Sequence, residues 1–277
     1  MSLQFHIDLK PGMTWDELVQ LAALAEDDND VDAVAAARLI EVRTSIASAL
    51  KAPHGPAASE DYIIYLLQSI EGSTPSELPE RVDIPALILG EPRTRLAAQT
   101  RERIAANTFA YSAEDLCVVD WNSALVYDPR DAPEVTDVLE FALTHLMEFR
   151  SFDDILDQRL ERLYSDVERR RPSLFYRGFE RLSRDANALY LEFADYVERV
   201  ENSVKFVGDP YLATIFGSAV MRFDLRKWEE SVGRKLSALA RTSELLQGEV
   251  NVRRSHFLEI IIIVLILYEI IAPAFRN

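Results

Sequence analysis

The chain has 277 residues, 48% of them hydrophobic, and a formal net charge of −16 from 46 acidic and 30 basic side chains. The hydrophobic fraction is large enough for a packed core and argues against wholesale disorder. The net charge argues against non-specific binding of nucleic acid by the whole surface, although a local basic site remains open. The single cysteine, Cys117, cannot form an internal disulfide. Because it lies in the apolar run 116–119, we interpret it as a small buried hydrophobe.

Residues 1–57 predict an N-terminal extension made of one strand and two helices. The strand is expected from Leu3 to Leu9. Thr14 is a plausible N-cap of the first helix, since Glu17 follows three residues later as in a capping box.

Residues 58–131 predict a mixed α/β region. A helix is expected around 61–70, a strand near 82–90 and a helix around 94–107. Between Asp115 and Pro129 the sequence predicts two strands joined by a turn at Asn122-Ser123.

Residues 132–256 predict a helical coiled-coil region. Apolar residues recur at mixed intervals of three and four from Val135 to Val167, which indicates a long amphipathic helix that ends before Pro172. A second helix is expected from Phe179 to Val204, followed by a break at residues 208–210.

The last predicted helix runs from Leu225 to Ile271 and would be about 70 Å long. A heptad pattern runs through it without a slip, which predicts a coiled-coil seam with helices of the same chain, of other copies, or both. The seam positions are Leu236, Leu239, Ser243, Leu246, Val250, Arg253, Phe257, Ile260, Val264, Leu267 and Ile271.

The segment 257–275 has 19 residues and only two charged side chains, Glu259 and Glu269. It predicts a single C-terminal transmembrane helix, because about 20 apolar residues cross a bilayer. Arg253 and Arg254 flank it, and the positive-inside rule then predicts a single-pass tail anchor in a bacterial-type inner membrane, with the bulk of the chain cytoplasmic. No signal or transit peptide is recognisable at the N-terminus. The alternative is an apolar helix buried inside a soluble oligomer.

The C-terminal motif resembles that of a known family. Residues 251–259, NVRRSHFLE, followed by an Ile-rich run and Glu269, are similar to the signature of the required for meiotic nuclear division protein family. The segment 209–216 and the strand pair around 121–127 are also similar, although the turn lacks the usual Gly. The resemblance covers about residues 80–273 and implies a membrane-anchored α/β and coiled-coil protein without known catalytic activity. A mitochondrial member of that family supports organelle translation.

No catalytic, metal-binding or cofactor-binding constellation stands out, since the four histidines are scattered and no phosphate-binding glycine loop is present. One basic, aromatic-rich stretch is a candidate anion patch for RNA or lipid headgroups, although cations at a helix C-terminus are the alternative. Its arginines are Arg169, Arg170, Arg171, Arg177, Arg181 and Arg184. Glu259 and Glu269 fall off the heptad seam, and Glu269 predicts a further partner helix in the membrane.

The sequence therefore predicts an α+β fold, in which a small α/β region is followed by long antiparallel or coiled-coil helices and one transmembrane helix. The predicted function is a membrane-anchored oligomeric scaffold or interaction protein, neither an enzyme nor a binder of a small-molecule substrate or cofactor. The expected partners are the membrane and further copies of the chain. A tether that contacts the ribosome or RNA, or another membrane protein, is the alternative, and an ion-channel accessory is a further one.

Overall fold

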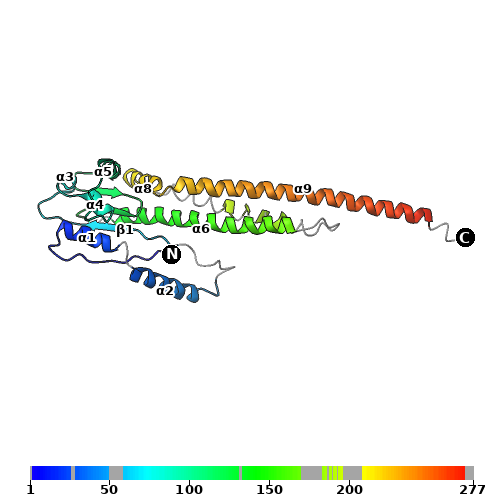
Figure 1. Cartoon of the computed structure of the whole chain (residues 1–277), viewed down its shortest axis with the longest axis horizontal. Helices are drawn as coiled ribbons and strands as arrows, with labels where there is room; N and C mark the ends of the chain where they lie inside the picture. The colour runs from blue at the N-terminus through cyan, green and yellow to red at the C-terminus, as the bar shows by residue number, and fades with distance from the viewer. Residues whose placement is uncertain are drawn as a thin grey trace. The chain divides into compact units, whose positions relative to one another are not determined.

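The computed structural model describes residues 2–25, 29–49, 59–130, 133–169, 183–185, 187–188, 190–191, 193–195 and 208–271. The chain divides into two compact units. Unit 1 comprises residues 1–148 and 207–226, and unit 2 comprises residues 149–206 and 227–277. Unit 1 is therefore discontinuous in sequence, since residues 207–226 return to it after the chain has passed through unit 2 (Figure 1).

Two helices begin unit 1. Helix α1 (Trp15–Ala25) starts at the predicted capping box, because the backbone N–H of Glu17 donates to Thr14 Oγ1 at 3.3 Å and that of Thr14 donates to Glu17 Oε2 at 2.8 Å. Helix α2 (Asn29–Ser45) has no buried side chain among those described. The predicted strand at 3–9 is wrong, since the described residues 2–10 belong to no strand.

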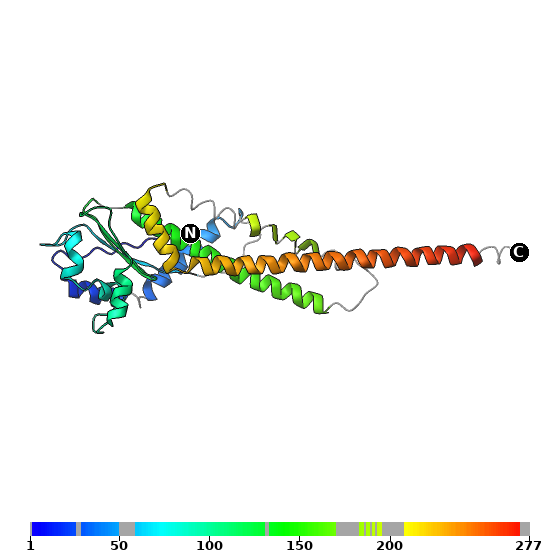
Figure 2. The ribbon, with the colours of Figure 1, turned by 90° about the horizontal axis from the view of Figure 1, so that it is seen from above.

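A four-stranded mixed sheet forms the centre of unit 1 (Figure 2). Its strands are β1 (Ile63–Leu67), β2 (Thr108–Phe109), β3 (Leu116–Val119) and β4 (Ser123–Tyr127), in the order β1-β4-β3-β2. β1 runs parallel to β4, and the other pairs are antiparallel. The predicted hairpin is confirmed as β3 and β4, with Leu116 opposite Tyr127 and Val119 opposite Ala124.

Two sequence predictions in this region are wrong. The predicted helix at 61–70 contains strand β1, whose residues pair with β4. The predicted strand at 82–90 is instead the short helix α4 (Ile84–Ile88). Asp83 caps this helix by accepting the backbone N–H of Ala86 at 3.2 Å, and a proline in the first turn fits a helix start. The helix expected at 94–107 is confirmed as α5 (Ala98–Ala105).

Both faces of the sheet are covered at strands β3 and β4. One face packs against α1, α3 (Leu78–Arg81), α4 and α5, in a core that includes Tyr65, Val118, Leu125 and Tyr127, and the short 3-10 turn η1 (Pro75–Glu77) leads into α3. On β3 and β4 the alternate residues Cys117, Val119, Ala124 and Val126 face the other way and are also buried. Helix α8 (Pro210–Arg222) packs on β3 from that side. The first half of α6 (Pro133–Arg169) packs beside α8, with the Phe141 and Phe216 rings 5.8 Å apart.

Unit 2 is built on parts of two long helices, whose predictions are confirmed. Residues 149–169 come from α6, and residues 227–271 come from α9 (Leu225–Ile271). The described residues between 183 and 195 are also helical, whereas the rest of the helix predicted at 179–204 lies outside the described residues. One apolar core joins the three segments, and it includes Leu156, Phe193 and Leu239.

The prediction of a transmembrane helix is wrong. In the part of the chain that the structure describes, no helix is both long and apolar enough to cross a membrane. The described apolar part of α9, residues 257–271, spans about 22 Å at 1.5 Å per residue. A bilayer core is about 30 Å thick. The tail anchor and the single-pass inner-membrane location fall with that helix.

Candidate interaction site

The heptad seam of α9 is buried over its first turns in unit 2. Leu239 is fully buried, and Leu236, Ser243 and Leu246 are each less than a tenth exposed. The three leucines pack in one core with Phe149, Leu156, Leu160 and Leu163 of α6 and with Phe193. The predicted seam is therefore a real helix-packing surface from residue 236 to residue 246.

The same seam continues along α9 into an exposed apolar segment. Val250 and Arg253 are half-buried, and from residue 257 every side chain described is exposed. The twelve large apolar residues between 257 and 270 are 39% to 71% exposed. They lie on all sides of the helix. We call residues 257–270 the apolar segment of α9; Arg253 and Arg254 precede it, and Glu259 and Glu269 lie within it, exposed.

A polar cluster fastens α9 to α6 within unit 2. The Lys235 ammonium lies 2.7 Å from Asp153 Oδ1 and 2.6 Å from Asp157 Oδ2. Ser231 Oγ donates to Asp153 at 2.8 Å. Burial lowers the pKa of Lys235, but the bonds to the two carboxylates outweigh it and hold that pKa above its ordinary value. This ion cluster fixes where one helix sits along the other.

The predicted arginine patch lies mostly outside the described residues. Arg169 ends α6, and Arg184 is exposed on a described helical turn. Arg170, Arg171, Arg177 and Arg181 lie outside the described residues. The patch stays a prediction: binding to RNA should fall steeply with salt if its cations contact phosphates.

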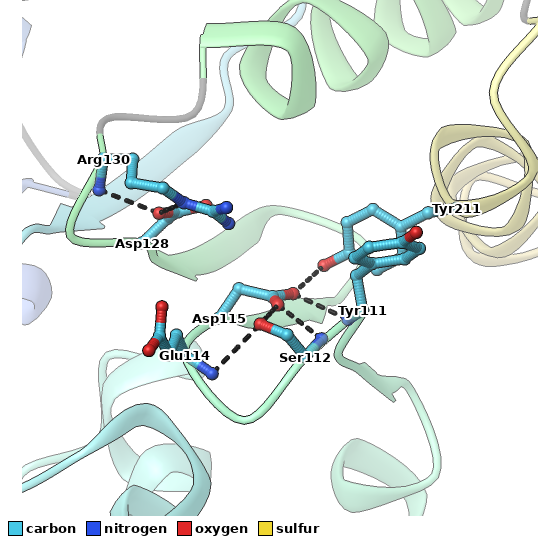
Figure 3. Close-up of polar contacts among 7 residues, drawn as sticks. All are labelled: Tyr111, Ser112, Glu114, Asp115, Asp128, Arg130 and Tyr211. Atoms are coloured by element: carbon cyan, nitrogen blue, oxygen red, sulfur yellow. Dashed lines mark hydrogen bonds and ion pairs between the residues drawn. The ribbon is translucent and has the colours of Figure 1, made fainter.

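In unit 1, a buried carboxylate holds together the start of β3 and the start of α8 (Figure 3). Asp115 is 4% exposed. Its Oδ2 accepts the Tyr111 backbone N–H at 2.7 Å and the Tyr211 hydroxyl at 2.9 Å, and its Oδ1 accepts the N–H and the hydroxyl of Ser112, both at 2.6 Å. Burial raises the pKa of Asp115, but these hydrogen bonds outweigh it and hold the pKa below its ordinary value.

A second carboxylate, Asp128, lies at the same end of the hairpin, because it follows β4 where Asp115 precedes β3. Its Oδ1 accepts the backbone N–H of Arg130 at 2.8 Å, and its Oδ2 lies 3.1 Å from the Arg130 guanidinium. Hydrogen bonds from the Arg130 side chain hold the pKa of Asp128 below its ordinary value despite partial burial.

The opposite end of the hairpin carries a buried ion cluster. Asp120, 1% exposed, accepts Arg103 at 3.2 Å and pairs with Arg222, the last residue of α8. Asp120 Oδ2 and Arg222 Nε are buried, and neither has a hydrogen-bond partner among the residues that the structure describes. The Tyr62 hydroxyl lies 2.8 Å from the carbonyl oxygen of Ser123 and 3.0 Å from that of Asp120.

Helix α8 is thus attached to β3 at both ends. Tyr211 at its start bonds to Asp115, and Arg222 at its end pairs with Asp120. Eleven residues of helix rise about 16.5 Å, and five residues of strand rise about the same. This match in length lets one helix satisfy both acidic ends of the strand.

The chemistry of these polar groups is structural. The four hydrogen bonds to Asp115 fill the acceptor capacity of a carboxylate and leave it no free lone pair for a substrate. Burial raises the pKa of the Cys117 thiol to about 12, so the thiol is not an activated nucleophile. His145 is buried against Phe141 at 4.3 Å, and burial lowers its pKa. Among the residues described, no group of three or more His, Cys, Asp or Glu side chains is placed to hold a metal ion.

Comparison with known proteins gives a family match over the first half of the chain. Residues 1–134 match the family described as uncharacterized protein MJ0711, N-terminal domain. The chain is also 24% identical over 214 residues to the uncharacterized protein MJ0711 of Methanocaldococcus jannaschii, an alignment that covers 76% of this chain and 65% of that relative. The chain therefore spans less than two thirds of the relative it matches. No solved structure matches the chain.

These matches correct the resemblance to the meiotic nuclear division family, which is wrong. That resemblance rested mainly on the Ile-rich stretch at 251–270, with weaker similarity at 209–216 and 121–127. The family match lies instead in residues 1–134 and includes the first 80 residues, which the resemblance did not cover.

Proposed function

We propose that this protein is a non-catalytic scaffold that assembles with further copies of itself through α9. The observation that carries the proposal is the apolar segment at 257–270, which is exposed to solvent on a helix whose seam is already buried at 236–246. Because the heptad pattern passes from the buried part into the exposed part without a break, the occupant that fits it is another α9.

The apolar segment supports an assembly of more than two copies. Two helices that share only the seam positions would leave Ile262, Leu265 and Ile266 in water, and these are 52% to 59% exposed. Burying the exposed half of each of the twelve large apolar side chains contributes about 1 kcal/mol apiece. Association costs about 4–15 kcal/mol, so burial of this surface on two or more copies is large enough to drive assembly.

The test is the mass of the full chain in solution, by light scattering and sedimentation, against 31.5 kDa for one copy. We expect a mass of more than two copies. A seam variant that combines Ile260→Gln, Val264→Gln and Leu267→Gln should give single copies.

The matched control removes the same number of aliphatic side chains off the seam, by Ile262→Gln, Leu265→Gln and Ile266→Gln. This variant should lower the copy number to two without dissociating the seam. A single copy of the unmodified chain at all concentrations would refute the proposal, and so would equal effects of the two variants.

A further inference from the structure

The segment 2–10 has the pattern of a strand, although it is not part of one in the described chain. Polar residues alternate in it with large apolar ones, a period typical of a strand with one buried face. Its apolar side chains are 39% to 60% exposed: Leu3, Phe5, Ile7 and Leu9. The Gln4 amide donates to Glu140 of α6 at 2.8 Å, so the segment lies beside α6 at that point.

Strand β1 offers an edge to which such a segment can be added. It pairs with β4 on one side, and no described strand pairs with its other side. The Ile63 N–H bonds to Asn122 and the Leu67 carbonyl accepts the N–H of Asp128, both toward β4. The N–H and C=O groups of the alternate residues, Ile64 and Leu66, therefore point outward, and such an edge is a template for pairing with another chain.

One antiparallel register matches both the charges and the apolar side chains. It places Lys10 opposite Asp61, two side chains of opposite charge that are both exposed. The same register places Ile7 opposite Ile64, and Phe5 opposite Leu66. Directly opposite pairs of these kinds stabilise an antiparallel sheet.

The apolar pairs in this register also share one face of the sheet. Tyr65 and Leu67 belong to the core on the face covered by α1 and α4. Leu66 therefore points to the opposite face, where it is 40% exposed. The added strand would cover this exposed leucine with Phe5.

We propose that residues 3–9 of one copy pair antiparallel with the outer edge of β1 in a second copy. Within one chain the segment lies beside α6 through its side-chain bond, and its apolar side chains stay 39% to 60% exposed. The strand edge that would cover them is therefore assigned to a second copy. The pairing uses unit 1 alone. It is therefore independent of the α9 assembly, and either can fail without the other.

The test is a disulfide between two separately made full-length chains, one with Phe5→Cys and a mass tag, the other with Leu66→Cys. Directly opposite residues of a hydrogen-bonded antiparallel pair lie about 5.5 Å apart at Cα, within disulfide range. In a glutathione redox buffer we expect a cross-linked heterodimer of unequal masses. Cys117, 1% exposed, will not compete.

Two control chains define the background. Gln4→Cys places the thiol on the opposite face of the added strand, and Leu24→Cys places it on α1, at a residue 72% exposed. The yield with Phe5→Cys should exceed both at least several-fold. Equal yields would overturn the proposal, and so would a disulfide that forms only within a chain carrying both Phe5→Cys and Leu66→Cys. The same mixture is then made with both chains carrying the α9 seam substitutions, which should prevent assembly through α9. The cross-link should still form at high protein concentration, which distinguishes this contact from chance contacts within an α9 assembly.

Discussion

Replacing Tyr211 with phenylalanine should destabilise unit 1 where α8 meets β3. The change removes one hydroxyl that donates to Asp115 at 2.9 Å, and Asp115 is 4% exposed. A hydrogen bond to a charged group contributes about 1.5–3 kcal/mol. Since the same oxygen keeps the Tyr111 N–H, we expect a loss at the lower end, about 1–2 kcal/mol. Hydrogen exchange of peptides from β3 and β4 across a urea series measures it.

The pH dependence of this loss follows from the lowered pKa of Asp115. A carboxylate with a depressed folded pKa contributes stability that is present above its unfolded pKa, about 3.9, and is lost as the pH falls through the folded value. The difference between the Tyr211→Phe variant and the unmodified chain should therefore be full at pH 6 and shrink below about pH 4.

The neighbouring ring provides a matched control. The ring centroids of Tyr111 and Tyr211 lie 5.7 Å apart, but Tyr111 is 78% exposed. Tyr111→Phe should therefore change the free energy of unfolding by less than about 0.5 kcal/mol. Equal losses from the two variants would refute the reasoning, and a Tyr211→Phe loss that stayed constant below pH 4 would refute the role of the Asp115 charge.

Three further predictions concern single buried groups. In urea unfolding, Asp153→Asn should destabilise unit 2 more than Asp157→Asn does. Both carboxylates contact Lys235, but the Asp153 side chain is 13% exposed and the Asp157 side chain 57%, and the reverse order of the two losses would contradict this reasoning. Cys117, with a pKa of about 12, should react with iodoacetamide only after unfolding, and rapid labelling of the native chain at pH 8 would argue otherwise. Asp120→Asn should cost about 3 kcal/mol in thermal or urea unfolding, since it leaves a partly buried arginine without its counter-ion; a loss below about 1 kcal/mol would show that the pair is dispensable.

The elements that could be predicted are those whose pattern is local and long. The hairpin follows from two apolar runs around a polar turn, and α6 and α9 follow from periods repeated over 37 and 47 residues. β1 could not be recognised, because Ile63, Ile64, Leu66 and Leu67 fit one side of a helix as well as a strand. Its pairing with β4, about 60 residues later in the chain, decides the matter. At α4, Asp83 and Pro85 were signals of a helix start that the strand prediction overlooked.

The polar contacts of unit 1 could not be predicted from spacing. Asp115 and Tyr211 are 96 residues apart, and only the return of the chain to unit 1 brings them together. The available signal was weak: two acidic residues, Asp115 and Asp120, flank a strand that is buried on both faces. The apolar segment of α9 was predicted to be a transmembrane helix, which is wrong, because apolar composition alone does not distinguish a lipid partner from a protein partner.

The discontinuity of unit 1 sets the order in which it can be completed during synthesis. β3 and β4 leave the ribosome about 80–100 residues before α8 does. During that interval the face of β3 that carries Cys117 and Val119 has no α8 to cover it, and Asp120 lacks Arg222. A fragment that stops at residue 134, where the family match ends, would remain in that state permanently. Within unit 1, the helix that covers this face of β3 is therefore translated last.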